Sequence, residues 1–184
     1  MRVIAGIARG HKLVPVPGSH TRPTTDRVKE AIFSMIGPYF EGGIGLDLFA
    51  GTGGLGIEAL SRGLDRVIFV DQQPQAIRVI KQNLTATRLI GQAEIYRKDA
   101  GKLITWLQQR EIQFRVIFLD PPYSEKQLVH FLEEIGENNL LRQDGVVVLE
   151  HSAAQSFPDV IAGLTVTKQK KYGHIHISLF RHAE

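Results

Sequence analysis

The chain alternates short apolar runs with segments in which apolar residues recur every three or four positions. The apolar runs predict strands at residues 44–48, 66–70, 93–96, 114–119 and 145–150. The segments of helical period follow them at residues 55–62, 74–86, 102–110 and 125–135. Regular alternation of this kind predicts right-handed βαβ units, and hence an α/β protein built on a mostly parallel sheet.

The two ends of the chain depart from this alternation. Near the C-terminus, residues 165–170 and 175–180 read as two strands without a helix between them, which predicts an antiparallel pair closing the sheet. The N-terminal part opens with a predicted hairpin and continues with one apolar helical face, which Thr24 or Thr25 can cap. We therefore expect a small hairpin and helix extension over residues 1–40 and a core domain over residues 41–184.

Composition and charge narrow the class of protein. The chain has no cysteine, which excludes disulfides, thiolate catalysis and cysteine-bound zinc. It has neither an apolar run of the roughly 18 residues that would span a bilayer nor a secretory signal at its start, so we expect a cytoplasmic protein without a membrane partner. Residues 1–36 hold six basic and two acidic side chains, whereas the remaining residues hold 16 basic and 17 acidic ones. The extension is therefore predicted to contact a polyanion, although a solvated surface would have the same charge.

A glycine-rich segment follows the first core strand and opens a helix. Gly51, Gly53 and Gly56 fit the spacing G-x-G-x-x-G, which permits a tight turn and a close approach of backbone to ligand. Because NAD-binding loops have the same spacing, this signal alone does not choose between cofactors.

Three acidic residues favour S-adenosylmethionine over NAD. Asp47, Asp71 and Asp99 end three successive strands, so they are predicted to converge on one crevice. There Asp47 could attract the cationic amino-acid end of S-adenosylmethionine and would repel a pyrophosphate. Asp71 could accept hydrogen bonds from ribose hydroxyls, and Asp99 could accept one from the adenine amino group. Taken singly, each could equally be a helix cap or a solvated strand end.

The most specific motif is Asp120-Pro121-Pro122-Tyr123, which follows the fourth predicted core strand. An aromatic amine is a poor nucleophile, because its lone pair is delocalised into the ring. Asp120 and the carbonyl of Pro121 could accept the two amine hydrogens and so turn the lone pair toward a methyl sulfonium. The prolines hold that carbonyl rigidly, and Tyr123 offers a face on which an extruded base can stack. The same four residues also occur as an ordinary turn.

Together these motifs resemble a known group of enzymes. Asp-x-Phe-x-Gly-x-Gly followed by Asp-Pro-Pro-Tyr resembles the class I methyltransferases that act on exocyclic amines. Residues 2–6, 9–10 and 21–31 resemble the bacterial RsmD family, whose members methylate N2 of guanine in 16S ribosomal RNA. The resemblance implies a Rossmann-like fold with a seven-stranded, mostly parallel sheet whose last strand is antiparallel. It also implies ribosomal RNA as substrate, which we expect a monomer to bind in an assembled small-subunit particle.

The resemblance and the motifs give a set of expected site residues. The residues expected at S-adenosylmethionine are Asp47, Phe49, Gly51, Thr52, Gly53, Gly56, Asp71, Gln72, Asp99 and Ala100. The residues expected at the target amine are Asp120, Pro121, Pro122 and Tyr123. The residues expected at the RNA are Arg9, Arg22, Thr24 and Arg27, for which solvation and helix capping are the structural alternatives. We expect no metal, because the histidines lack metal-ligand spacing.

Three other functions remain open at this point. The motif at Asp120 also serves adenine-N6 methyltransferases of DNA or RNA. RNA is favoured, because the chain leaves only the small extension for reading a DNA sequence, whereas a folded RNA is recognised largely by shape. A non-catalytic RNA-binding module would have no chemical need for the motif, and an NAD-dependent dehydrogenase is disfavoured by Asp47 and by the short chain.

Overall fold

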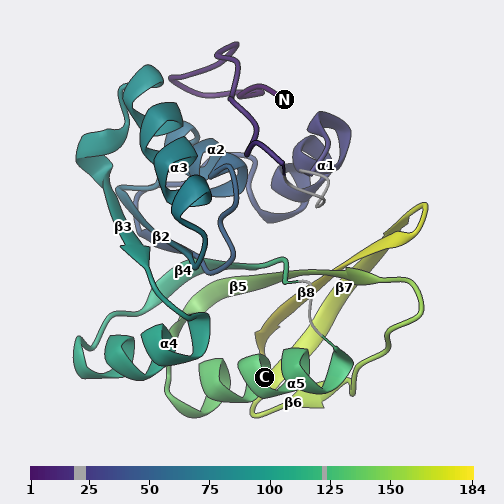
Figure 1. Cartoon of the computed structure of the whole chain (residues 1–184). Helices are drawn as coiled ribbons and strands as arrows, with labels where there is room; N and C mark the ends of the chain where they lie inside the picture. The colour runs from purple at the N-terminus through teal and green to yellow at the C-terminus, as the bar shows by residue number, and fades with distance from the viewer. Residues whose placement is uncertain (19–23, 122–123) are drawn as a thin grey trace. The chain divides into compact units, whose positions relative to one another are not determined.

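The computed structural model, which describes residues 1–18, 24–121 and 124–184, confirms the predicted alternation of helices and strands (Figure 1). Its contacts divide the chain into two compact units, Met1–Ala100 and Gly101–Glu184. The division into an extension and a core, at residue 40, stays a prediction.

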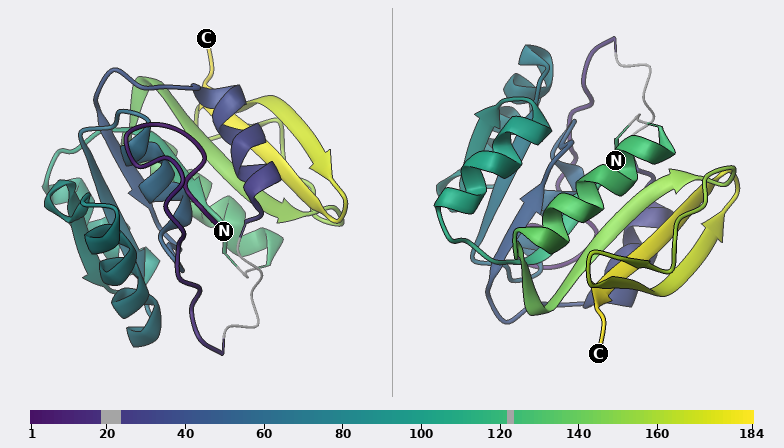
Figure 2. Two further views of the ribbon diagram at one scale, coloured as in Figure 1. Left: turned by 90° about the horizontal axis from the view of Figure 1, so that it is seen from above. Right: turned by 90° about the horizontal axis from the view of Figure 1, so that it is seen from below.

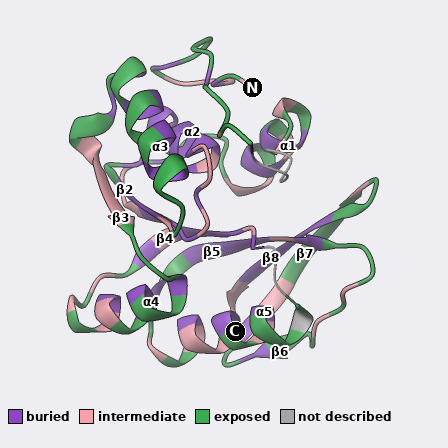
Figure 3. Cartoon of the chain, in the orientation of Figure 1, coloured by how far each residue is buried: buried purple, intermediate pink, exposed green. Residues whose placement is uncertain are grey.

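The first unit carries three parallel strands in the order β3-β2-β1. The strands are β1 (Ile44–Asp47), β2 (Arg66–Asp71) and β3 (Ala93–Arg97). The helices are α1 (Asp26–Ile36), α2 (Gly54–Ser61) and α3 (Pro74–Ala86), with a 3-10 turn at Ile90–Gln92. Buried residues recur along one side of α1 and α3, as the periodicity predicts (Figure 3). Thr25 caps α1 by accepting a 3.3 Å hydrogen bond from the Val28 N–H.

The second unit carries five strands in the order β4-β5-β8-β7-β6. The strands are β4 (Phe114–Leu119), β5 (Leu141–Ser152), β6 (Val160–Ile161), β7 (Leu164–Tyr172) and β8 (Ile175–His182). The helices are α4 (Ala100–Gln109), which starts at the last residue of the first unit, and α5 (Glu125–Glu137). β4 and β5 are parallel, whereas β8 runs antiparallel to both β5 and β7, so the expected antiparallel last strand is confirmed.

The two units form eight strands among the described residues, one more than the seven that the resemblance implies. The additional strand is β6, which has only two residues and pairs with the start of β7. Ala162 and Gly163 both have positive φ, 48° and 80°, which is the conformation of a tight two-residue hairpin turn. β6 was not predicted from the sequence, because two residues are too few to show a period.

The predicted N-terminal hairpin forms around an antiparallel bridge between Arg2 and Lys12. Backbone hydrogen bonds of 2.9 to 3.0 Å join its two arms, from Val3 to His11, from Gly10 to Val3 and from Leu13 to Met1. The backbone N–H groups of Ile4 and Ala5 bond to the two carboxylate oxygens of Glu58 on α2, at 2.8 and 3.1 Å. Glu58 thereby holds the segment between the two arms of the hairpin against α2. The predicted hairpin is therefore present, in a short form.

Glu58 is also the centre of a buried group of charges, which we call the Glu58 cluster: Glu58, Lys29 and Arg62. Glu58 and Lys29 have no exposed surface, and Arg62 is 5% exposed. Lys29 Nζ lies 3.4 Å from Glu58 Oε1, and Arg62 Nε lies 2.9 Å from Oε2. Burial lowers the pKa of Lys29, and the neighbouring Glu58 charge opposes that effect. The cluster joins α1 and the N-terminal segment to α2, the helix that follows the glycine loop.

Candidate functional site

The glycine loop turns the chain sharply from β1 into α2. Gly51 and Gly53 have positive φ, 56° and 82°, a region that residues with a Cβ rarely adopt. The Gly53 N–H donates a 2.8 Å hydrogen bond to the Ala50 carbonyl, and the Ala50 N–H donates one of 2.9 Å to Val70 on β2. A Cβ added at Gly51 would meet no atom within 4 Å, so this part of the loop faces open space. The loop is therefore a fixed turn with room beside it for a ligand.

The third glycine of the motif acts through packing. A Cβ at Gly56 would lie 2.3 Å from Cε1 of Phe69, so only glycine lets α2 approach β2 this closely. The role agrees with that of the third glycine in dinucleotide-binding loops, which permits close helix–strand packing. Gly56 thus contributes to the expected cofactor site indirectly, because it lets α2 pack closely against β2.

Asp47 ends β1 and lies under the start of α2. Its side chain is 3% exposed, and Oδ2 accepts a 3.1 Å hydrogen bond from the Gly56 N–H. Burial raises the pKa of Asp47 to about 7; the Gly56 hydrogen bond opposes the rise, and the negative charge of Asp71 adds to it. A buried carboxyl that is only partly ionised near pH 7 becomes more fully ionised when a cation binds beside it. The arrangement therefore suits the binding of a positively charged group.

Asp71 ends β2 and bonds to the glycine loop directly. Its Oδ2 accepts a 2.9 Å hydrogen bond from the Gly51 N–H, and its Oδ1 accepts one of 2.9 Å from the Gln73 N–H ahead of α3. One carboxylate therefore fixes the loop and the start of a helix at once. Each oxygen keeps a second lone pair, so Asp71 can still accept hydrogen bonds from a ligand.

Asp99 completes the row of acids at the carboxyl end of this three-stranded sheet. It is exposed, and its Oδ2 accepts a 2.9 Å hydrogen bond from Nε2 of Gln72, the residue after Asp71. The next residue, Ala100, is buried at 2% exposure. The parallel pairing of β1, β2 and β3 brings their carboxyl ends to one edge, as the sequence predicts. The first unit thus brings together Asp47, Asp71, Gln72, Asp99 and the glycine loop.

Phe49 and Thr52 complete the loop. Phe49 is half-buried in the turn after β1, and Thr52 Oγ1 accepts a 3.2 Å hydrogen bond from the Gly54 N–H. Sequence reasoning missed Asn83, which is 1% exposed on α3. Asn83 Nδ2 donates to the carbonyls of Thr52, at 2.9 Å, and of Val14, at 3.1 Å, so it ties the loop to the N-terminal segment. A polar residue on the apolar face of a predicted helix is the signal that could have identified it.

The structure describes only part of the Asp-Pro-Pro-Tyr motif. Asp120 follows β4 and is half-buried, and Pro121 is buried. Pro122 and Tyr123 lie outside the described residues. The chain resumes at Ser124, whose N–H donates a 3.2 Å hydrogen bond to Oε1 of Gln127 and so starts α5. Asp120 and Pro121 therefore stand at the carboxyl end of a buried strand, where the sequence places them.

The expected RNA-contact residues lie in the first unit. Arg9 and Arg27 are exposed, Thr24 is half-buried, and Arg22 lies outside the described residues. Arg2, in the same N-terminal segment, donates its backbone N–H to Asp26 Oδ1 at 3.2 Å. Asp26 therefore bonds to the N-terminal segment as well as standing in the first turn of α1.

The described part of the chain contains no group of three or more histidine, cysteine, aspartate or glutamate side chains that could hold a metal ion. Among the same residues, no helix is long and apolar enough to cross a membrane. The expected absence of a metal site stays a prediction.

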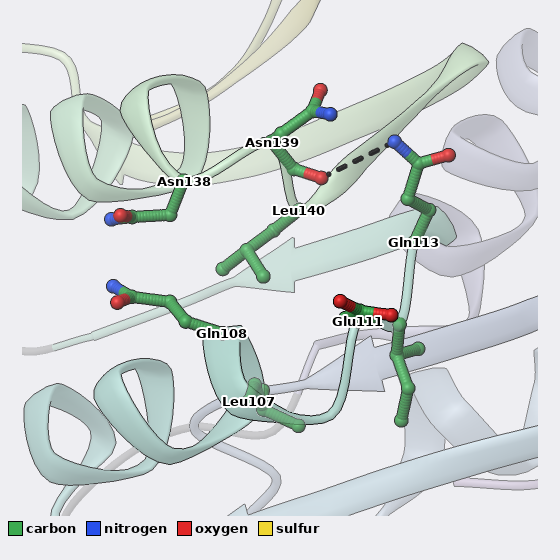
Figure 4. Close-up of a pocket in the computed structure, with 8 residues that line it drawn as sticks. Leu107, Gln108, Glu111, Gln113, Asn138, Asn139 and Leu140 are labelled. Carbon is green, nitrogen blue, oxygen red and sulfur yellow. Dashed lines mark hydrogen bonds between the residues drawn. The ribbon is translucent and has the colours of Figure 1, made fainter.

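A polar cavity of about 220 Å³ lies in the second unit, where α4 and α5 end (Figure 4). Its lining includes the side chains of Gln108, Glu111, Gln113 and Asn138, and Gln113 Nε2 donates a 3.4 Å hydrogen bond to the Asn139 carbonyl. The cavity contains none of the residues predicted from the motifs. It lies at the amino ends of β4 and β5, whereas Asp120 follows the carboxyl end of β4.

Proteins of known structure share the fold of nearly the whole chain. A candidate methyltransferase of known structure from Escherichia coli, yhhF, matches with a TM-score of 0.85 at 29% identity, covering 99% of this chain and 97% of that one. A Thermus thermophilus protein of known structure matches with a TM-score of 0.82 at 28% identity, covering 98% and 99%. The chain therefore has the Rossmann-like fold of class I methyltransferases. The order of its strands, its glycine loop and its similarity to these two structures all support this conclusion.

Sequence comparison then gives the family. The family model described as conserved hypothetical protein 95 matches residues 1–181, and the chain belongs to this family. A candidate rRNA methyltransferase of Bacillus subtilis, YlbH, is 49% identical over 181 residues, covering 98% of each chain. The ribosomal RNA small subunit methyltransferase D of Escherichia coli is 31% identical over 182 residues, covering 98% of this chain and 89% of its own length. The resemblance drawn from the motifs is thus confirmed.

Proposed function

We propose that this protein transfers the methyl group of S-adenosylmethionine to the exocyclic N2 of a guanine in 16S ribosomal RNA. Its substrate is the RNA within an assembled small-subunit particle, and it acts as a cytoplasmic monomer. The proposal is carried by one observation. Asp47, Asp71 and Asp99 end three neighbouring parallel strands beside the glycine loop, and an Asp-Pro-Pro-Tyr sequence directly follows β4. The names of relatives that cover nearly the whole chain support ribosomal RNA as substrate.

The described residues fit S-adenosylmethionine. The buried carboxyl of Asp47, whose pKa is about 7, would become more fully ionised beside the cationic amino-acid end, while Asp71 and Asp99 would receive the ribose hydroxyls and the adenine amino group. The open space beside Gly51 leaves the backbone accessible to the ligand. When bound, the cofactor supplies a methyl group that is already activated on a sulfonium.

The motif residues act on the target base. The Asp120 carboxylate and the Pro121 carbonyl accept the two hydrogens of the exocyclic amine, which orients its lone pair and stabilises the positive charge that develops on the nitrogen. Tyr123, which lies outside the described residues, supplies an aromatic ring for stacking of the extruded base. A guanine N2 and an adenine N6 present the same pair of hydrogens, so the choice of guanine follows the resemblance.

Transfer of labelled methyl tests this function. Purified protein is given separate pools of ribosomal RNA, small ribosomal subunits and DNA, and the labelled nucleosides are identified after digestion. We expect N2-methylguanosine from the small-subunit RNA, with the assembled particle as the better substrate. Label found in N6-methyladenosine or in DNA would contradict the assignment of the base or of the nucleic acid, and no transfer to any pool would contradict the activity.

A further inference from the structure

The β7–β8 hairpin concentrates positive charge away from the N-terminal extension. Residues 160–183 contain Lys168, Lys170, Lys171 and Arg181 but no aspartate or glutamate. The preceding residues, 37–159, contain 12 basic and 16 acidic side chains. Basic residues therefore outnumber acidic ones in two segments of the chain, residues 1–36 and this hairpin.

β7 is exposed on both faces where its lysines lie. Residues 167–171 are all exposed, although alternate residues of a sheet strand are ordinarily buried (Figure 3). The two strands of the hairpin run side by side in every view, and the register pairs Lys168 with Leu179 and Lys170 with Ile177 (Figure 2). The other edge of β7 is covered at its start, where Leu164 and Thr165 pair with β6 and the Val166 N–H donates a 3.1 Å hydrogen bond to the Asp159 carbonyl. The β8 partners Leu179 and Ile177 are buried, so the exposed charge is carried by β7.

The lysine side chains are available to a ligand. Within the described residues, those of Lys168, Lys170 and Lys171 make no hydrogen bond or ion pair with the protein. Gln169 between them is held differently, since its Nε2 donates a 2.9 Å hydrogen bond to Ser178 Oγ on β8. Ser178 Oγ in turn lies 2.7 Å from Nε2 of the buried His151 on β5. The strand is thus tied to the sheet while its lysines extend into solvent.

Protection of the sheet edge is a second use for exposed lysines, because charge on an edge strand discourages pairing with another chain. Charge of either sign serves that purpose, and many edges mix lysine with glutamate. The absence of every acid over residues 160–183 is not required for edge protection. A hairpin that carries only positive charge is, however, suited to binding a polyanion.

We infer that the β7–β8 hairpin is a second RNA-contact surface, on which Lys168, Lys170 and Lys171 bind backbone phosphates. The identity of the RNA rests on the proposed function. Lys168 and Lys170 lie two residues apart on one strand, about 6.6 Å along it, so they share a face and can contact successive phosphates. Contacts of this kind add affinity without reading sequence, which suits an enzyme whose target is presented by a folded RNA.

The salt dependence of RNA binding tests this surface. The variant Lys168→Gln/Lys170→Gln is compared with a control of equal charge change, Arg78→Gln/Lys81→Gln, whose residues are exposed on α3 in the first unit. Both are titrated with purified small-subunit ribosomal RNA at about 50 to 200 mM salt. We expect the hairpin variant to bind on the order of 25-fold more weakly near 0.1 M salt, with a salt slope smaller by about 1.4. The control should keep the wild-type affinity and slope.

Wild-type affinity and slope in the hairpin variant would overturn the inference, as would an equal loss in the control. Equal melting temperatures of the three proteins exclude a folding defect. Because binding is read without catalysis, wild-type protein that binds the RNA but transfers no methyl to it would contradict the proposed function alone. The comparison of the two variants would still decide whether the hairpin contacts RNA.

Discussion

The backbone N–H of Gly51 donates a 2.9 Å hydrogen bond to Oδ2 of Asp71, 20 residues further along the chain. This bond joins the carboxyl end of β2 to the turn after β1. The other oxygen of Asp71 holds the start of α3 through the Gln73 N–H. The shape of the glycine loop therefore depends on an acid that was expected to serve the ligand.

Replacing Asp71 with alanine should weaken cofactor binding for two reasons, because it removes an acceptor for the ligand and releases the loop. Loss of one hydrogen bond to a charged group costs about 1.5 to 3 kcal/mol, so affinity for S-adenosylhomocysteine should fall by at least about tenfold. Isothermal calorimetry with S-adenosylhomocysteine measures this affinity. Asp65→Ala is the matched control, since Asp65 also accepts a backbone N–H, that of Gly43, at 2.9 Å. Unchanged affinity in Asp71→Ala would remove this residue from the site.

Cofactor affinity should depend on pH through Asp47. Its pKa near 7 means that the free protein carries a largely neutral carboxyl at pH 6 and a largely ionised one at pH 7.5. Because the ionised form attracts the cationic amino group, affinity should rise roughly eightfold over that interval. Calorimetry at a series of pH values measures the change. The variant Asp47→Asn, which cannot ionise, should bind more weakly and show a flat profile; a wild-type profile that stays flat would refute the role of Asp47.

Gly56→Ala tests the packing role of the third glycine. The added methyl would overlap the ring of Phe69, and overpacking of this kind costs about 1 to 3 kcal/mol. Chemical denaturation should show a loss of stability in that range. Gly91→Ala is the control, because a Cβ there meets no atom within 4 Å. Equal stability of the two variants would show that α2 does not need glycine to approach β2.

The Glu58 cluster should be a major contributor to stability of the first unit. Glu58→Gln keeps the shape of the side chain but leaves Lys29 and Arg62 buried without an anion, which costs about 3 to 5 kcal/mol. Denaturation measures this loss, and proteolysis near residue 5 should accelerate as the N-terminal segment is released. Asp144→Asn, at an exposed ion pair with Arg142, should change stability by less than about 0.5 kcal/mol. A Glu58 variant as stable as this control would contradict the assignment.

Local patterns predicted much of the fold. The core strands, the helix capped by Thr25 and the antiparallel end of the sheet all follow from period, capping and turn residues that lie close together in the chain. Convergence of Asp47, Asp71 and Asp99 was also predictable, because parallel strands place their carboxyl ends at one edge. These features require no knowledge of which distant segments touch.

The features that were missed depend on contacts between distant segments. Glu58 reads as an ordinary polar helix residue, and only the folded chain shows that it binds the backbone of Ile4 and Ala5 and so holds the N-terminal hairpin against α2. Asn83 likewise acquires its role from Val14, 69 residues away. The hydrogen bond between Asp71 and the glycine loop was missed for the same reason. The spacing of the sequence predicts that Asp71 ends β2, but not that its carboxylate binds the Gly51 N–H.

The most direct test of the central claim is the rate of methyl transfer by Asp120→Ala, measured in a single turnover on small ribosomal subunits. Affinity for S-adenosylhomocysteine is measured on the same protein by calorimetry. If Asp120 holds the target amine, transfer should fall by about 10³-fold or more while affinity stays within about twofold of wild type. Transfer at the wild-type rate would contradict the account.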